Sequence, residues 1–168
     1  MIIQVAAAVG RGVTRLAAFD AALVAAGVAD RNLIYLSSVL PPASLVEPVE
    51  RIDRTPGDWG DRLYCVMAHA ETSVPGTQVW AGIGWVQDSS GRGLLVEHEA
   101  TDETSVRHLV AASLHGLCRN RGLAFPLSAT LVAGVDCTGE PVSALVVAVF
   151  ESAAWRRADS RELAAADA

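Results

Sequence analysis

Lysine is absent from this chain of 168 residues, and all thirteen of its basic residues are arginine. The absence excludes every mechanism that requires a lysine amine: a Schiff base with pyridoxal phosphate, a lysine-dependent aldolase and a Walker P-loop. Aromatic residues are also scarce, at 5% of the chain. Few rings are therefore available to line a sugar-binding cleft, which disfavours a glycosidase.

Cysteine is scarce as well, with three residues, Cys65, Cys118 and Cys137, that lie far apart and form no CxxC pair. This pattern fits neither a disulfide framework nor a zinc site, so we expect no metal and a reducing, cytoplasmic setting. The longest uninterrupted apolar run, Ala144–Phe150, is far shorter than the roughly 18 residues that cross a bilayer. The start of the chain carries no basic segment typical of a signal peptide. We expect no membrane partner.

Charged residues make up only 19% of the chain, and the net charge is −6. An acidic chain repels phosphates, so nucleic acid is not an expected partner. The 51% share of hydrophobic residues excludes disorder. Together with the low charge, it predicts that a partner or further copies of the chain bury part of its surface. The length fits a single domain, which we place at residues 1–155, with a frayed tail over 156–168.

Hydrophobic patterning predicts an α+β fold in which two helices cover an antiparallel or mixed sheet. The first helix spans Arg15–Ala26, with Thr14 as its N-cap and Leu16, Phe19 and Leu23 at helical spacing. The second helix spans Thr101–Asn120. Strands are expected at Ile2–Val9, Asn32–Ser38, Leu63–Thr72, Gln78–Val86, Leu94–Glu99, Leu127–Val135 and Val142–Glu151.

Three connections between these elements complete the outline. The Pro75-Gly76 turn predicts a hairpin between the strands on either side of it, and Asp136–Pro141 predicts a final hairpin. Ala43–Asp61 holds prolines, a glycine and several charges, so we expect an irregular connection there.

Two serines, Ser37 and Ser38, end a predicted strand shortly before Pro41-Pro42. Such a pair is usually just the polar end of a strand that leads into a turn. Ser89-Ser90, in a segment of Asp, Ser and Gly residues, is an example of this ordinary role. A serine hydroxyl can also attack the preceding peptide carbonyl in an N-to-O acyl shift. β-Elimination then cuts the chain and leaves dehydroalanine, which hydrolyses to a pyruvoyl group. That carbonyl supports amine chemistry without lysine.

The serine pair belongs to a wider pattern. Four segments occur in a characteristic order and spacing: Gly12–Gly27, Asn32–Pro42 (Asn-Leu-Ile-Tyr-Leu-Ser-Ser-Val-Leu-Pro-Pro), Val74-Pro75-Gly76, and Gly93–Glu99 (Gly-Leu-Leu-Val-Glu-His-Glu). Together they resemble the pyruvoyl-dependent arginine decarboxylases. The resemblance is close over the first 42 residues and patchy to about residue 100.

The resemblance implies a four-layer αββα sandwich that assembles as a trimer or a dimer of trimers, with the active site between subunits. It implies decarboxylation of L-arginine to agmatine and CO2, a step in polyamine synthesis. Cleavage would fall between Ser37 and Ser38, and Ser38 would become the covalent pyruvoyl cofactor. By the same resemblance, Asn32 supports processing or the pyruvoyl carbonyl, Asp20 faces the substrate guanidinium, and Glu97 returns a proton to Cα.

The acidic residues allow interpretations of their own. Glu97 and Glu99 share one face of a strand, about 7 Å apart. Desolvation of one of them would let it hold a proton as a general acid, and a glycosidase-like pair is the other interpretation. His98 would point to the opposite face. Asp20 fits either a solvent-facing helix position or a bidentate partner for a guanidinium.

Three alternatives remain open at this stage. The same chemistry could act on histidine, aspartate or ornithine. Arg11, a cation near the expected substrate position, would favour an acidic or neutral amino acid over arginine. An unprocessed chain could instead be a non-enzymatic, ligand-binding trimer.

Overall fold

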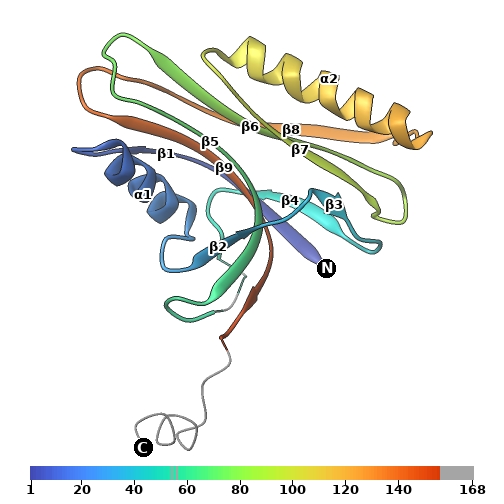
Figure 1. The fold of residues 1–168 in the computed structure, drawn as a ribbon. Helices are drawn as coiled ribbons and strands as arrows, with labels where there is room; N and C mark the ends of the chain where they lie inside the picture. The colour runs from blue at the N-terminus through green and yellow to red at the C-terminus, as the bar shows by residue number, and fades with distance from the viewer. Residues whose placement is uncertain (54, 56, 156–168) are drawn as a thin grey trace, which may run out of the picture.

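The computed structural model describes residues 1–53, 55 and 57–155. In this part of the chain, nine strands form two sheets and a helix covers each sheet (Figure 1). The expected frayed tail, 156–168, lies outside the described residues. In chain order the elements are β1 (Ile2–Arg11), α1 (Arg15–Ala26), β2 (Asn32–Tyr35), β3 (Val39–Leu40), β4 (Leu45–Val49), β5 (Arg62–Thr72), β6 (Gln78–Gln87), β7 (Gly93–Ala100), α2 (Glu103–Arg121), β8 (Leu127–Asp136) and β9 (Val142–Ala153).

The two sheets differ in strand direction. The five-stranded sheet has the order β2-β5-β9-β1-β4 and is mixed, because β1 pairs with β4 and β2 pairs with β5 in parallel. The four-stranded sheet has the order β3-β7-β6-β8 and is antiparallel throughout. The predicted α+β class is therefore confirmed.

Three clusters of buried apolar residues fill the spaces between the layers. The largest lies between the two sheets, the second between α1 and the five-stranded sheet, and the third between α2 and the four-stranded sheet. In β9, Ala144, Val146 and Ala148 face the first cluster, and Leu145, Val147 and Val149 face the second. Burial on both faces explains why this strand is an unbroken apolar run. The arrangement is compatible with an αββα sandwich. Among the described residues, no helix has the length and apolar character to span a membrane.

Helix α1 has the predicted boundaries, and its buried face is centred on alanines. Thr14 accepts a hydrogen bond from the Ala17 amide, and Gly27 ends the helix in the left-handed conformation. The fully buried residues are Ala18, Ala22 and Ala26, whereas Leu16 is 74% exposed. Small residues let the helix lie close to β1: a side chain at Gly10 would collide with the Ala18 carbonyl oxygen. Of the residues noted at helical spacing, Phe19 and Leu23 are partly buried and pack against the same cluster, and only Leu16 lies outside it.

The two hairpins predicted at Pro75-Gly76 and at Asp136–Pro141 are both wrong, because each connection joins strands of different sheets. Strands β5 and β6 belong to different sheets, as do β8 and β9. The connection over residues 73–77 is long enough to cross the roughly 10 Å between stacked sheets. The turn after β6 does form a hairpin, because β6 pairs with β7.

The segment expected to be irregular contains one strand. Strand β4 lies within Ala43–Asp61 and includes Pro48. It is an edge strand that pairs with β1. A proline is tolerated there because an edge strand leaves one side of its backbone without a ladder hydrogen bond.

Candidate active site

The Ser37–Ser38 peptide bond lies where the chain passes from one sheet to the other. Strand β2 is in the five-stranded sheet and β3 in the four-stranded sheet. The Leu36 amide donates to the Cys65 carbonyl oxygen on β5 at 3.0 Å, and the Leu95 amide on β7 donates to the Ser38 carbonyl oxygen at 2.8 Å. The bond is therefore held between two anchors, one on each sheet.

Ser38 has a backbone conformation that is rare for a residue with a side chain. Its φ is 62°, and Ala43 is the only other non-glycine residue with positive φ among those described. Holding such a residue in this region costs on the order of 1–3 kcal/mol. The two anchoring hydrogen bonds hold the chain on either side of the Ser37–Ser38 bond in this conformation.

The positive φ also decides where the Ser38 hydroxyl can reach. Substituents on Cα are about 120° apart around the N–Cα bond, so a φ of 62° places Cβ gauche to the Ser37 carbonyl carbon. At a helical φ of about −60°, Cβ would lie anti to that carbon and its hydroxyl could not approach it. The observed backbone therefore brings the attacking group to the correct side of the peptide.

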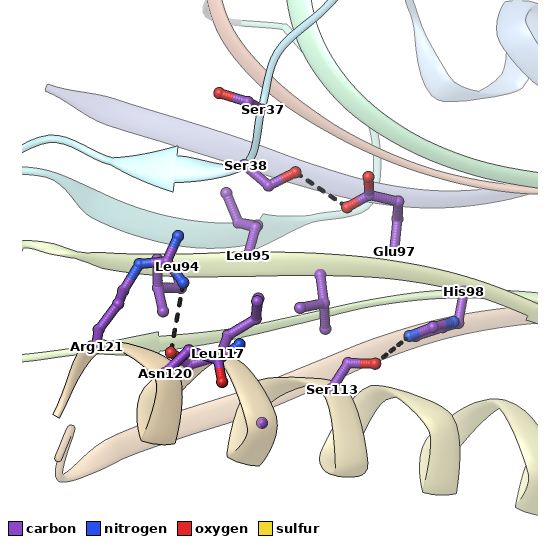
Figure 2. A pocket seen from close by; sticks show the side chains of 12 residues that line it. Ser37, Ser38, Leu94, Leu95, Glu97, His98, Ser113, Leu117, Asn120 and Arg121 are labelled. Carbon is purple, nitrogen blue, oxygen red and sulfur yellow. Dashed lines mark hydrogen bonds between the residues drawn. The ribbon is translucent and has the colours of Figure 1, made fainter. Parts of the chain in front are cut away.

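Glu97 on β7 faces the same serine. The Ser38 hydroxyl donates a hydrogen bond to Oε2 of Glu97 at 3.0 Å (Figure 2). Leu95, two residues earlier on β7, holds the Ser38 carbonyl, so one strand fixes both the backbone and the hydroxyl. A hydrogen-bond acceptor in this position fixes the orientation of the hydroxyl. The structure thus brings together Ser37, Ser38 and Glu97, three residues to which the family resemblance assigns roles.

The thiol of Cys65, whose backbone anchors Leu36, is not a competing nucleophile. Cys65 is buried, and desolvation raises the pKa of its thiol to about 11. The thiol stays protonated near neutral pH and is inert. Tyr35, which pairs with Cys65 in register, has a phenol whose pKa is raised by burial and then by the charges of Cys65 and Glu99.

A cavity of about 480 Å³ runs from the serine pair around the edge of β7 to helix α2. His98 and Glu97 lie on opposite faces of β7, as predicted. His98 Nε2 and Ser113 Oγ lie 2.6 Å apart, and this hydrogen bond ties β7 to α2. The lining residues are Ser37, Ser38, Leu94, Leu95, Val96, Glu97, His98, Ser113, Gly116, Leu117, Asn120 and Arg121.

The other two predicted site residues lie elsewhere in the single chain. Asn32 donates from Nδ2 to the Gly60 carbonyl oxygen at 2.5 Å, in a smaller hollow that Trp59 also lines. Asp20 is exposed on α1, which packs on the five-stranded sheet. One chain alone therefore does not gather Asp20 or Asn32 at Ser38.

The arginine that lines the cavity is not the one that the sequence suggested. Arg11, considered as a possible selector of the substrate, donates from Nη2 to the Asp136 carbonyl oxygen and does not line the cavity of its own chain. Arg121 does line it, and sequence reasoning missed this residue. An arginine in the last turn of a helix is ordinarily explained by the helix dipole, so no local signal marked it.

Comparison with known proteins gives the family. The family described as "Pyruvoyl-dependent arginine decarboxylase" matches residues 2–152. Relatives named pyruvoyl-dependent arginine decarboxylase include one from Halobacterium salinarum, 41% identical over 103 residues, which are 61% of this chain and 62% of that protein. Another, from Thermococcus kodakarensis, is 32% identical over 151 residues, or 87% of this chain and 92% of that protein. A third, from Methanopyrus kandleri, is 35% identical over 141 residues, covering 83% and 89%.

The chain therefore belongs to the pyruvoyl-dependent arginine decarboxylase family, and the resemblance noted in the sequence is confirmed. The matched segment spans 62% of the length of the Halobacterium salinarum relative. The family name implies a covalent pyruvoyl group, and the residues at the serine pair fit its formation. They supply a hydroxyl on a strained backbone and a carboxylate that accepts its hydrogen bond.

Proposed function

We propose that this chain cleaves itself between Ser37 and Ser38 and then decarboxylates L-arginine to agmatine and CO2. The observation that carries the proposal is the junction itself. The hydroxyl of Ser38 is held by Glu97, and its Cβ is gauche to the carbonyl that it would attack. We place the activity in a single domain, residues 1–155, of a cytoplasmic protein.

Self-cleavage uses groups of this chain and one water molecule. Ser38 Oγ, oriented by its hydrogen bond to Glu97, bonds to the Ser37 carbonyl carbon as the C–N bond breaks, and the hydroxyl proton passes to the freed nitrogen. Loss of the Ser38 Cα proton and cleavage of its Cβ–O bond then release a carboxylate at the end of residues 1–37. Water hydrolyses the remaining dehydroalanine, ammonia leaves, and residue 38 becomes the pyruvoyl group.

In turnover, the pyruvoyl group supplies a carbonyl that condenses with the substrate amine and accepts electrons from Cα. Glu97 lies near this position and returns a proton to Cα after CO2 leaves. The proximity of Glu97 to Ser38 supports this role. Asn32 supports processing or the carbonyl, as the family resemblance implies.

The full site is proposed to form between copies of the chain, as a trimer or a dimer of trimers. The exposed surface of α1 supports this: Val13 is 87% exposed, and Leu16 and Val24 are exposed on either side of Asp20. Apolar groups in such a row favour burial against a partner. A neighbouring copy would then supply Asp20 to the guanidinium of a substrate bound at Ser38.

The substrate assignment predicts a selective effect of Asp20→Asn. This change keeps the shape of the side chain and removes its charge. A charge-assisted contact is worth roughly 1.5–3 kcal/mol, so kcat/KM for arginine should fall roughly 10- to 150-fold. Self-cleavage at Ser38 should stay normal. Steady-state assays of agmatine release, with Asp136→Asn as an exposed control outside the cavity, measure the effect.

A panel of amino acids completes this test. Arginine turnover that collapses only in Asp20→Asn supports the assignment. Processed wild-type protein that ignores arginine and acts on aspartate or glutamate would contradict it, and Arg11 would then become the candidate selector.

A further inference from the structure

The cavity at Ser38 has two chemically different ends. At one end Glu97 accepts a hydrogen bond from Ser38. At the other end, beside helix α2, lie Asn120 and Arg121 (Figure 2). The self-cleavage and proton return described above use only the first end. The second end includes a bare stretch of helix, because a Cβ added at Gly116 would meet no atom within 4 Å.

Arg121 is the only arginine among the residues that line the cavity, and its guanidinium is not committed to an acid. Nη1 donates to the Leu117 carbonyl oxygen at a long 3.4 Å. Arg15, Arg92 and Arg107 each have a carboxylate partner, whereas Arg121 has none among the residues that the structure describes. A guanidinium has five N–H donors in a planar fork that matches a carboxylate. Most of this donor capacity is available to a ligand.

We propose that Arg121 binds the α-carboxylate of the amino-acid substrate, an inference that rests on the proposed function. The side chain extends from the end of α2 to the level of Leu94, on the β7 strand whose edge Ser38 covers (Figure 2). In an α-amino acid the amine and the carboxylate are both bonded to Cα. A substrate whose amine lies at Ser38 therefore has its carboxylate close to Ser38 as well. The guanidinium of arginine cannot lie at this end, because two cations repel. It therefore points away from α2.

This contact serves affinity and not the rate of bond breaking. The carboxylate loses its charge as CO2 departs, so an arginine that holds it stabilises the bound substrate more than the transition state. Removal of such a contact raises KM and leaves kcat unchanged or higher. This kinetic split separates a carboxylate anchor from a catalytic residue.

The test compares two ligands that differ only in the carboxylate and contain no amine that could condense with a carbonyl. These are δ-guanidinovalerate, which is arginine without its amine, and butylguanidine, which also lacks the carboxylate. Isothermal titration of the purified oligomer gives Kd for each. In Arg121→Gln, the Kd of δ-guanidinovalerate should rise roughly 10- to 150-fold, the cost of one charge-assisted contact. The Kd of butylguanidine should not change.

Arg119→Gln is the matched control, because Arg119 is exposed in the same helical turn and does not line the cavity. It should leave both Kd values unchanged. Equal Kd values in wild type and Arg121→Gln would overturn the inference. So would tighter binding of both ligands, which would place the guanidinium beside Arg121. Circular dichroism of the variant confirms that it is folded.

Kinetics give the second readout and separate this inference from the proposed function. In active protein, Arg121→Gln should raise KM for arginine without lowering kcat; a lower kcat at unchanged KM contradicts the inference. Wild-type protein that neither cleaves nor decarboxylates arginine would overturn the proposed function. The comparison of the two Kd values on that protein would still decide the role of Arg121.

Discussion

Ser38→Ala should yield one uncleaved chain and no decarboxylase activity. The change removes the hydroxyl that is hydrogen-bonded to Glu97 and leaves the backbone without an attacking group. No other side chain is expected to substitute: the thiol of Cys65 is buried and protonated, because desolvation raises its pKa to about 11. Denaturing electrophoresis of the purified variant against wild type measures the loss, which should be complete.

Ser37→Ala is the matched control for this result. Ser37 contributes the carbonyl carbon, which alanine also provides, so this variant should still cleave. Two chains from Ser38→Ala would show that the junction is cut without the Ser38 hydroxyl, for example by a contaminating protease. Such an outcome would remove the chemical basis of the proposed mechanism.

Glu97→Gln should have the second largest effect, and the effect should fall on turnover. Glutamine retains an oxygen that accepts the hydrogen bond from Ser38, so the variant should still cleave itself and bind arginine. It cannot return a proton to Cα. Turnover should therefore fall by roughly 10²–10⁴, the usual contribution of a positioned acid or base. Assays of agmatine release on protein of verified cleavage give the ratio.

Glu99→Gln provides the comparison for Glu97→Gln. Glu99 lies on the same face of β7 but has no hydrogen bond to Ser38 in the described structure. Its loss should have a much smaller effect on turnover. Equal losses in the two variants, or unchanged turnover in Glu97→Gln, would mean that a different group donates the proton.

Local features of this fold could be predicted from the sequence, and long-range pairing could not. Helix α1 begins after Thr14 and ends before Gly27 because the capping signals lie in the chain itself. The pairing of β5 with β9 depends instead on residues far away in sequence. A turn such as Pro75-Gly76 can close a hairpin or connect two facing sheets, and its sequence does not distinguish these outcomes.

The buried face of α1 shows a second limit of pattern analysis. Leu16, Phe19 and Leu23 recur at helical spacing, but only Phe19 and Leu23 pack against the core, and the alanines beside them are buried more deeply. The packing depends on how closely the helix can approach β1. Gly10 provides that close approach, and alanines fill the contact. Gly10 and the alanines are visible in the sequence, but their role as a contact surface follows only once the helix is known to pack on β1.

The candidate site divides in the same way. The serine pair and Glu97 were predicted, and one chain brings them together. The positive φ of Ser38 could not be predicted, because the residues that anchor the junction, Cys65 and Leu95, come from two different sheets. The roles assigned to all the site residues remain predictions, and Asp20 and Asn32 do not lie at Ser38 within one chain.

Intact mass spectrometry of the purified wild-type protein under denaturing conditions tests the central claim most directly. Cleavage between Ser37 and Ser38 predicts two chains, residues 1–37 and 38–168, and a larger chain whose first residue carries a carbonyl and no free amine. Carbonyl-specific labelling should mark the larger chain alone. A single intact chain in a preparation that decarboxylates arginine would contradict the account.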